Sequence, residues 1–328
     1  MKVAILSDGI PGHVNQSIGI INLLSEDISI EFEIIPLHQK YSFLRALIKV
    51  YKKFLSRNLS TRNAKIIKSL YEDIKIKNVD LLIATGGNTA HICASLGKIY
   101  SVMTIQNGKA SGILSSNYKL HITLDKRKGP SNIRTFFPPN TTKLVNKTSK
   151  NNKVLFLIGG NGSGYTFQKN DFNVLINNIK KFSTKNNISP IIVTSRRTPF
   201  FLEDLMHAEL KDICDSSSVW YHKDNSNFNL QKLFNESDMI FVTEESSTMI
   251  AEAICSGLPV VTIYPEKHKK EKRHQDQLYK YIKTDLITRI SIKSELEFND
   301  CNIRNNIKKI KMEKQDLKNK ILKGINNE

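Results

Sequence analysis

The stretch from Met239 to Ile263 constrains the fold more than any other part of this chain. It opens with an apolar run, Met239–Val242, short enough for a buried strand, and a polar turn follows at Thr243–Ser247. Apolar residues then recur at helical spacing up to Gly257-Leu258-Pro259, after which a second apolar run begins at Val260. This order of strand, loop, helix and strand is typical of a parallel sheet with crossover helices.

The loop inside this unit carries carboxylates and hydroxyls where the next helix begins. A helix start favours anions, because its amides are unpaired and its dipole is positive there. Glu252 follows one turn later and could reach a ribose hydroxyl pair while the loop hydroxyls hold a phosphate. Alternatively, the serines only cap the helix and Glu252 is solvated. The candidate loop residues are Glu245, Ser246, Ser247 and Thr248.

Two more loops in the second half of the chain have the same character. The apolar run Val154–Ile158 leads into a glycine-rich loop, which indicates close backbone approach to a phosphate or sugar, or else a flexible turn. The run Ile191–Thr194 leads into two adjacent arginines, which suit a diphosphate or a surface ion pair. The candidate residues are Gly159, Gly160, Gly162, Ser195, Arg196 and Arg197.

The first half of the chain opens with a strand, a glycine turn and a helix. Val3–Leu6 precedes the turn Ser7–His13, whose spacing is not the GxGxxG of dinucleotide-binding folds. Asp8 and His13 form a candidate acid–base pair, or they only cap the helix and fix the loop. Later strands also end in small and polar residues, which indicates one crevice at the carboxyl edge of a parallel sheet. The candidates around it are Gly12, Gln16, Gly86, Gly87, Asn88 and Gln106.

The charge of the chain favours anionic partners. The formal net charge of +18 suits nucleotides, nucleic acid or an anionic membrane surface, and AT-rich coding bias is the rival explanation. The segment Tyr41–Leu55 predicts a basic amphipathic helix that can lie in a membrane interface or cover the sheet. No zinc-finger or aromatic RNA-binding pattern is present, so nucleic acid is not the expected partner.

At 328 residues the chain is long enough for two domains. The polar stretch Lys143–Asn152 is the best linker, so we predict domains at 1–148 and 149–328, the second with a helical tail at Asn302–Lys323 that packs on the body or binds an anionic surface. Four scattered cysteines indicate no disulfide framework, and a strand at Lys2–Leu6 leaves no room for a signal peptide. We therefore expect a cytoplasmic protein, peripheral on the inner face of the membrane if the amphipathic helix binds lipid.

Taken together, the motifs resemble the mitochondrial-fission ELM family, chiefly its bacterial branch. The resemblance spans about residues 3–265 and is most specific at Ser-Arg-Arg-Thr-Pro (195–199); the donor loop has Glu245-Ser246 where the family usually has Asp-Ser. The other matching segments are Ser7-Asp8-Gly9, Asn15-Gln16-Ser17, Thr85-Gly86-Gly87-Asn88-Thr89, Leu157-Ile158-Gly159-Gly160 and Thr243-Glu244-Glu245-Ser246 with Met249, Glu252, Ala253, Gly257 and Pro259.

The resemblance implies an α/β fold of two Rossmann-like domains with parallel sheets facing a cleft, the GT-B-like architecture of nucleotide-sugar glycosyltransferases. It implies transfer of a sugar from a nucleotide-sugar donor to a cell-envelope glycan or lipid-linked acceptor. The second domain would bind the donor, with Glu252 on its ribose, and the first would hold the acceptor beside Asp8 or His13. No cofactor and no metal are expected, because arginines and helix starts would stabilise the leaving phosphate.

Three other functions remain open from the sequence. A nucleotide-sugar epimerase would use the same two domains without an acceptor. A non-enzymatic membrane scaffold is suggested by the plant branch of the family. A glycosyltransferase acting on DNA would account for the basic charge.

Overall fold

The computed structural model describes residues 1–146, 149–224, 228–269, 271–298 and 303–326. It divides into two compact units, one of residues 1–141 together with the end of the chain from Lys311, and one of residues 142–310. This differs from the predicted division in two respects. The boundary falls at Thr141, whereas residue 148 lies outside the described residues, and the end of the chain belongs to the first unit rather than the second.

The first unit contains a six-stranded sheet in the order β2-β1-β3-β4-β5-β6, with every neighbouring pair parallel. Its strands are almost continuous apolar runs, as expected where helices cover both faces of a sheet. The strands are β1 (Lys2–Ser7), β2 (Glu31–Pro36), β3 (Leu81–Thr85), β4 (Met103–Asn107), β5 (Leu120–Thr123) and β6 (Asn132–Arg134).

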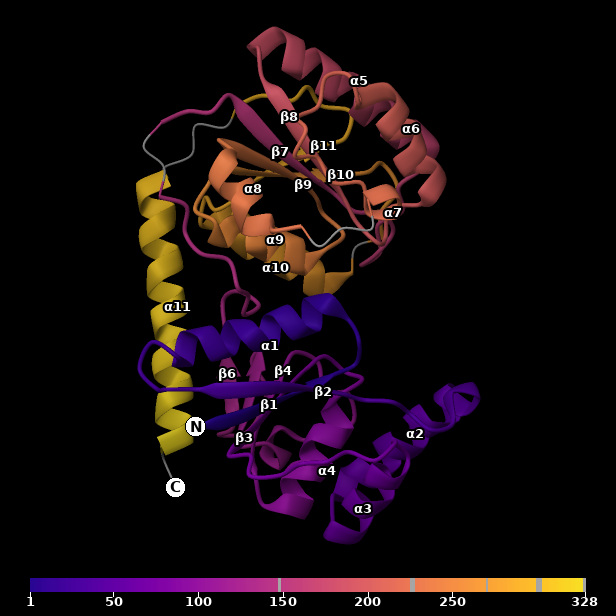
Figure 1. Cartoon of the computed structure of the whole chain (residues 1–328), viewed down its shortest axis with the longest axis vertical. Coiled ribbons are helices and arrows are strands. Elements are labelled where there is room, and N and C mark those ends of the chain that lie inside the picture. Colours follow the sequence, from indigo (N-terminus) through magenta and orange to yellow (C-terminus); the bar gives the residue numbers. More distant parts are fainter. Residues whose placement is uncertain (147–148, 225–227, 270, 299–302, 327–328) are drawn as a thin grey trace. The chain divides into compact units, whose positions relative to one another are not determined.

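Alternate residues of these strands enter two separate cores. Val3 and Ile5 of β1 pack under α1, whereas Ala4 and Leu6 pack with α3 and α4 on the opposite face, and Figure 1 shows these helices on the two sides of the sheet. The helices of the unit are α1 (Pro11–Leu24), α2 (Arg45–Leu55), α3 (Thr61–Ser69) and α4 (Ala90–Tyr100), with short 3-10 turns at Ser42–Leu44, Ser56–Asn58 and Ser115–Asn117.

The second unit contains a five-stranded parallel sheet in the order β11-β10-β9-β7-β8. Helices α5 and α6 pack with Phe156 and Phe241 of the sheet, and Figure 1 shows them together beside β8. Its strands are β7 (Lys153–Ile158), β8 (Ser189–Thr194), β9 (Met239–Thr243), β10 (Val260–Tyr264) and β11 (Thr288–Ser291). Its helices are α5 (Lys169–Asn186), α6 (Phe200–Leu210), α7 (Tyr221–Asp224), α8 (Leu230–Glu236), α9 (Ser247–Cys255) and α10 (Lys272–Lys283).

The stretch Met239–Ile263 forms the centre of this second sheet. β9 pairs with both β7 and β10, and α9 runs between β9 and β10 as the crossover helix. The prediction of an α/β fold with two parallel sheets is confirmed.

The tail forms one long helix, α11 (Ile303–Asn326), which starts in the second unit and ends in the first. Leu317 and Ile321 enter the core beneath β1 and β3, and Lys318 pairs with Glu26 and Asp27 at 2.8 and 2.9 Å. The apolar stripe of the tail therefore packs on the body of the protein, one of the two predicted alternatives; Asn302 lies outside the described residues. Within the described ranges, no helix combines the length and the apolar character that a membrane span requires.

Candidate functional site

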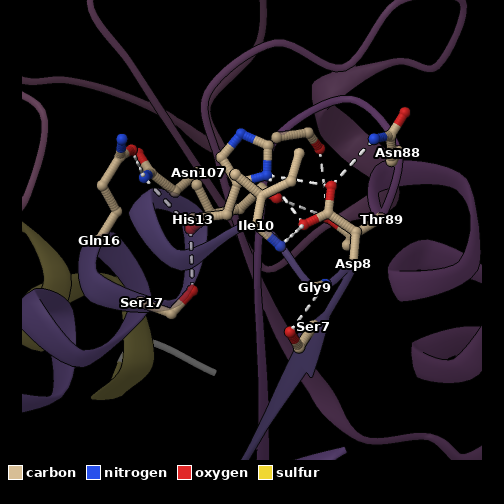
Figure 2. Close-up of polar contacts among 12 residues, drawn as sticks. Ser7, Asp8, Gly9, Ile10, His13, Gln16, Ser17, Asn88, Thr89 and Asn107 are labelled. Carbon is tan, nitrogen blue, oxygen red and sulfur yellow. Dashed lines mark hydrogen bonds and ion pairs between the residues drawn. The ribbon is translucent and has the colours of Figure 1, made fainter. Parts of the chain in front are cut away.

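The first unit brings Asp8 and His13 together, as the sequence predicts (Figure 2). Asp8 follows β1 and His13 lies in the first turn of α1, which Pro11 opens without a side-chain cap. The imidazole Nδ1 lies 3.0 and 3.1 Å from the two carboxylate oxygens. Because a carboxylate only accepts, Nδ1 carries the proton, and in the neutral ring Nε2 keeps its lone pair. No residue in the described part of the chain bonds to Nε2.

Asp8 is held in its ionised form. Burial raises its pKa, but hydrogen bonds from His13 and Asn88, the nearby imidazole and the amide of Ile10 together hold the pKa below its usual value. Asn88 Nδ2 donates to Oδ2 at 2.9 Å and the Ile10 amide to Oδ1 at 3.3 Å. The carboxylate can therefore orient His13 and stabilise its protonated ring.

Gly86 makes room for the imidazole. Its φ is +88°, which favours glycine, and a Cβ atom at this position would overlap the His13 ring. The end of β4 fixes this turn. The Gly86 amide donates to the Asn107 carbonyl at 2.9 Å, and the Gly86 carbonyl accepts from Gln106 Nε2 at 2.9 Å. The position of His13 thus depends on a backbone turn from a strand far away in the sequence.

The other acceptor-side candidates have different surroundings. Gln106 is fully buried and serves the Gly86 turn, whereas Gln16 accepts a 2.8 Å hydrogen bond from Asn107. Gly12 lies beside His13 in α1, and Gly87 and Asn88 precede α4. Asn107 was missed as a candidate, although its place at the end of β4 was a usable signal.

The second unit ties together the three loops that the sequence selects. Thr243 at the end of β9 accepts from the Gly159 amide at 2.7 Å, and Thr198 donates to the carbonyls of Ile158 and Gly159 at 3.0 and 2.9 Å. A Cβ atom on Gly160 would overlap the Arg197 carbonyl. The loops after β7, β8 and β9 therefore form one connected edge of the sheet, as predicted from their strands.

Glu245 lies at the centre of this edge. Its side chain is fully buried and packs against Gly159, where any Cβ atom would overlap it. Neither carboxylate oxygen accepts a well-formed hydrogen bond from the described residues. Burial raises its pKa to about 7, against the opposing influence of Thr243, nearby amides and the charge of Arg197. A buried carboxylate without donors is unfavourable in the absence of a ligand.

Glu252 is a second carboxylate in the same condition. It lies on α9, and no described residue forms a hydrogen bond or ion pair with its carboxylate. Burial raises its pKa to about 7. The alternative interpretation of the sequence, that Glu252 is solvated, is thus wrong, since only 8% of the residue is exposed.

The hydroxyls of the loop have separate tasks. Ser246 caps α9 by accepting from the Met249 amide at 3.4 Å, and Thr248 lies in the first turn. Ser247 lies 2.9 Å from His274 Nδ1, while His274 Nε2 donates to the Glu244 carbonyl at 2.6 Å. This tautomer makes Ser247 the donor to His274 and leaves its lone pairs for a ligand.

A buried ionic network behind the loop was not predicted. Glu244 accepts from Tyr165, Thr262 and Arg289 at 2.9, 2.7 and 2.7 Å, so its charge is fully compensated. Arg289 lies on β11, and no sequence pattern links it to the loop. The network fixes the backbone from which Glu245 and α9 extend.

The two arginines differ in their contacts. Arg197 Nη1 donates weakly to the Glu245 carbonyl at 3.4 Å and lies near Gly162, and its amide donates to Ser195 Oγ at 3.2 Å. Arg196 is exposed and makes no polar contact with the described residues. Both guanidinium groups retain donors for an anion.

Solved structures identify the class of fold. The glycosyltransferase SnogD from Streptomyces nogalater matches with a TM-score of 0.54 and 9% identity over 99% of each chain. Anabaena Alr3699/HepE, in complex with UDP and glucose, matches with a TM-score of 0.53 and 11% identity over 98% of each chain. A putative UDP-N-acetylglucosamine 2-epimerase from Listeria monocytogenes matches with a TM-score of 0.52 and 11% identity over 96% of this chain and 88% of its own. The fold is the predicted GT-B-like one.

A protein-family model also matches part of the chain. The model of the family described as mitochondrial fission ELM1 matches residues 137–299, nearly all of the second unit. The predicted resemblance to that family is therefore confirmed over the loops that carry Gly159, Arg197 and Glu245. No curated protein sequence matches the chain.

Proposed function

We propose that the protein is a glycosyltransferase that moves a sugar from a nucleotide-sugar donor to a hydroxyl group of a cell-envelope glycan or lipid-linked acceptor. The observation that carries this proposal is the Asp8–His13 pair, in which Nδ1 is held at 3.0 Å from the carboxylate and Nε2 has no partner among the described residues. A histidine oriented in this way can act as a general base near neutral pH.

In the proposed step, His13 Nε2 takes the proton of the acceptor hydroxyl as its oxygen bonds to the anomeric carbon of the donor sugar. The bond from that carbon to the diphosphate oxygen breaks, and its electron pair leaves with the nucleoside diphosphate. Asp8 stabilises the resulting imidazolium through the bond to Nδ1. The step is balanced without a redox cofactor, and it requires no metal ion if cationic side chains meet the leaving group.

The second unit supplies the donor side of the proposal. Glu245 and Glu252 are buried acceptors without donors, and the hydroxyl pair of a ribose provides two donors. Arg196 and Arg197, with the Ser246–Thr248 start of α9, would bind the diphosphate. The Anabaena structure with UDP and glucose makes UDP a sensible first probe.

We further propose that the protein acts on the cytoplasmic face of a membrane, as a peripheral protein. Helix α2 supports this location, because Leu47, Val50 and Phe54 are exposed on it by 67%, 68% and 67% while Lys49 and Lys53 flank them. Apolar and basic side chains together bind anionic bilayers.

The test measures UDP release from UDP-glucose and UDP-N-acetylglucosamine, with a membrane lipid extract as the source of acceptor. His13→Gln should lower kcat by roughly 10²–10⁴-fold, because it removes the base, and leave the Kd of UDP unchanged. Asp73→Asn, an exposed carboxylate of the same unit, serves as the control. Turnover by His13→Gln at the wild-type rate would contradict the role of His13.

Incubation with donor alone distinguishes the remaining functions. An epimerase would change the stereochemistry of the sugar without any acceptor and without net UDP release. A scaffold protein would neither bind UDP nor release it. Either result would rule out transfer as the activity of this chain.

A further inference from the structure

The first unit contains a pocket of about 630 Å³ at the carboxyl edge of its sheet. Its walls come from the loops after β1, β2, β3 and β4 and from α2 and α4. The volume suits a ligand larger than a single phosphate ion. We call it the lysine pocket, after Lys49, Lys52, Lys53 and Lys109 in its wall.

The lysine pocket carries an excess of positive charge. Its four lysines face two carboxylates, Asp8 and Glu72, which leaves two positive charges. Lys49, Lys53 and Lys109 are exposed and form no ion pair with any residue that the structure describes. Two such charges match the dianion of a phosphate or diphosphate group.

Lys52 occupies an unusual place for a lysine. With Ile48 and Leu55 it lies on the inward face of α2, at 6% exposure, where an apolar residue is expected. Its Nζ donates to the Tyr71 hydroxyl at 2.8 Å, and Tyr71 is another residue of the pocket wall. Lys52 therefore places an ammonium group in the wall of the pocket, at a helix position where an apolar side chain would otherwise pack.

The neighbouring histidine adds no charge. Burial and the positive charge of Lys52 lower the pKa of His91 to about 4, against the opposing bond to the Ser111 backbone and with a smaller contribution from Lys53. Ser56 donates to its Nδ1 at 2.7 Å. The imidazole of His91 is therefore neutral, and the positive charge of the pocket comes from the lysines.

The lysine pocket includes Asp8, Gly87 and Asn88, so it reaches the candidate catalytic carboxylate. Asn88 Nδ2 donates to Asp8, which places the wall of the pocket and the Asp8–His13 pair in one hydrogen-bonded group. An anion held by the lysines would therefore position the rest of an acceptor near the proposed base.

Helix α2 also borders the pocket with apolar surface. Leu47, Val50, Tyr51 and Phe54 form its exposed apolar face, and Val50 is a surface neighbour of Lys53 because the two are three positions apart on the helix. Helix α2 thus presents lysines to the pocket and apolar side chains next to it. Such a pairing matches an amphiphile, with an anionic head and a hydrocarbon tail.

We propose, building on the proposed transferase function, that the lysine pocket binds the phosphate or diphosphate group of a lipid-borne acceptor. The hydrocarbon chain of that lipid lies along the apolar face of α2. The anionic head binds Lys49, Lys53 and Lys109, and Lys52 lies behind them in the pocket wall. The acceptor hydroxyl extends toward Asp8 and His13. Lipid anchoring and acceptor recognition are then performed by one helix.

The experiment is calorimetric titration of the full chain with pyrophosphate, farnesyl diphosphate and farnesol. Farnesyl diphosphate should bind about tenfold or more tightly than pyrophosphate, and farnesol should bind weakly. The double variant Lys53→Gln/Lys109→Gln should weaken farnesyl diphosphate binding at least about tenfold, whereas Val50→Ser/Phe54→Ser should weaken farnesyl diphosphate alone. Lys2→Gln, an exposed lysine at the opposite end of β1, should change nothing.

Two outcomes would overturn the proposal. Unchanged binding by the double lysine variant would remove the pocket from recognition, and Arg197→Gln then shows whether the diphosphate binds the donor loops instead. Equal affinities for pyrophosphate and farnesyl diphosphate, insensitive to Val50→Ser/Phe54→Ser, would indicate a water-soluble phosphorylated acceptor. Titration with UDP in parallel tests the proposed function separately. If the wild-type protein does not bind UDP, the proposed transferase function is contradicted, whereas the proposal for the lysine pocket is not.

Discussion

At the scale of single residues, two glycines leave the space in which one imidazole and one buried carboxylate lie. Gly86 leaves room for the His13 ring and Gly159 for the Glu245 carboxylate, and a methyl group at either position would overlap its neighbour. At both positions it is the absence of a side chain that matters, because it leaves room for a neighbouring residue. The glycine turns that the sequence singles out therefore act as space for other side chains, in addition to any approach by a ligand.

Gly86→Ala is expected to lower the rate of UDP release to that of His13→Gln. The new methyl group would displace the imidazole from Asp8, and the φ of +88° would add strain of about 1–3 kcal/mol. Gly129→Ala is the matched control, because Gly129 has a φ of +108° and open space around its Cβ position. It should lose similar stability, measured by urea unfolding, and keep its activity. Full activity in Gly86→Ala would show that the position of His13 is not needed.

The two buried glutamates predict an unusual dependence of stability on pH. Their pKa values are raised from 4.5 to about 7 in the folded chain, so the folded state binds more protons than the unfolded state between these values. Stability should therefore fall as pH rises from about 4.5 to 7. Glu252→Gln should remove one contribution and stabilise the protein at pH 8 by about 3 kcal/mol, by linkage.

The measurement is the free energy of unfolding in urea at pH 5 and pH 8. Glu297→Gln, an exposed glutamate of the same unit, should leave the difference between the two pH values unchanged. Donor binding should at the same time weaken in Glu252→Gln. A variant with wild-type pH dependence and wild-type UDP affinity would show that Glu252 is solvated after all.

At the scale of elements, apolar runs and glycine turns were sufficient to predict strands such as β1, β7, β8, β9 and β10, but not the short edge strands β6 and β11. The central unit from β9 to β10 appears as expected, because each boundary coincides with a strong local signal such as Gly257-Leu258-Pro259. The loops at the sheet edges were predicted as well, since the carboxyl ends of parallel strands meet.

The contacts between distant elements could not be predicted in this way. Arg289 compensates Glu244 from a strand 45 positions away, and Lys52, Tyr71 and His91 meet in one pocket from three separate segments. Each of these residues has an ordinary local setting in the sequence. Their roles arise only when the sheet order is known, and no periodicity encodes that order.

Helix α11 gives a prediction at this scale. Leu317 is buried against the first sheet, whereas Met312 on the same helix is 59% exposed. Leu317→Ala should lower the free energy of unfolding by about 2–5 kcal/mol, because it leaves a cavity in a packed core. Met312→Ala should change it by less than about 0.5 kcal/mol. Equal effects in thermal unfolding would contradict the packing of this helix.

At the scale of the whole molecule, the basic residues do not all contribute in the same way. Some lysines form exposed pairs such as Lys180–Glu209 and Lys223–Asp204, which contribute little. The lysine pocket differs because three of its four lysines lack an ion pair among the described residues. The total of +18 alone could not distinguish coding bias from function, and the position of these four lysines favours a function for part of it.

The division of the chain was the least predictable feature. A polar stretch marks a connection, but it does not show which unit a later helix joins. The stripe of Leu317 and Ile321 could have packed on either sheet, and the core under β1 and β3 is where it lies.

Because the first unit takes Leu317 and Ile321 from the far end of the chain, its core is discontinuous in sequence. A ribosome that adds roughly 5–20 residues each second needs on the order of 10–30 s to pass from Thr142 to Ile310. During that interval the face of the sheet that carries Ile5 and Ile83 is covered by α1 but lacks Leu317 and Ile321. The nascent protein should therefore depend on chaperones that shield apolar surface until translation reaches α11.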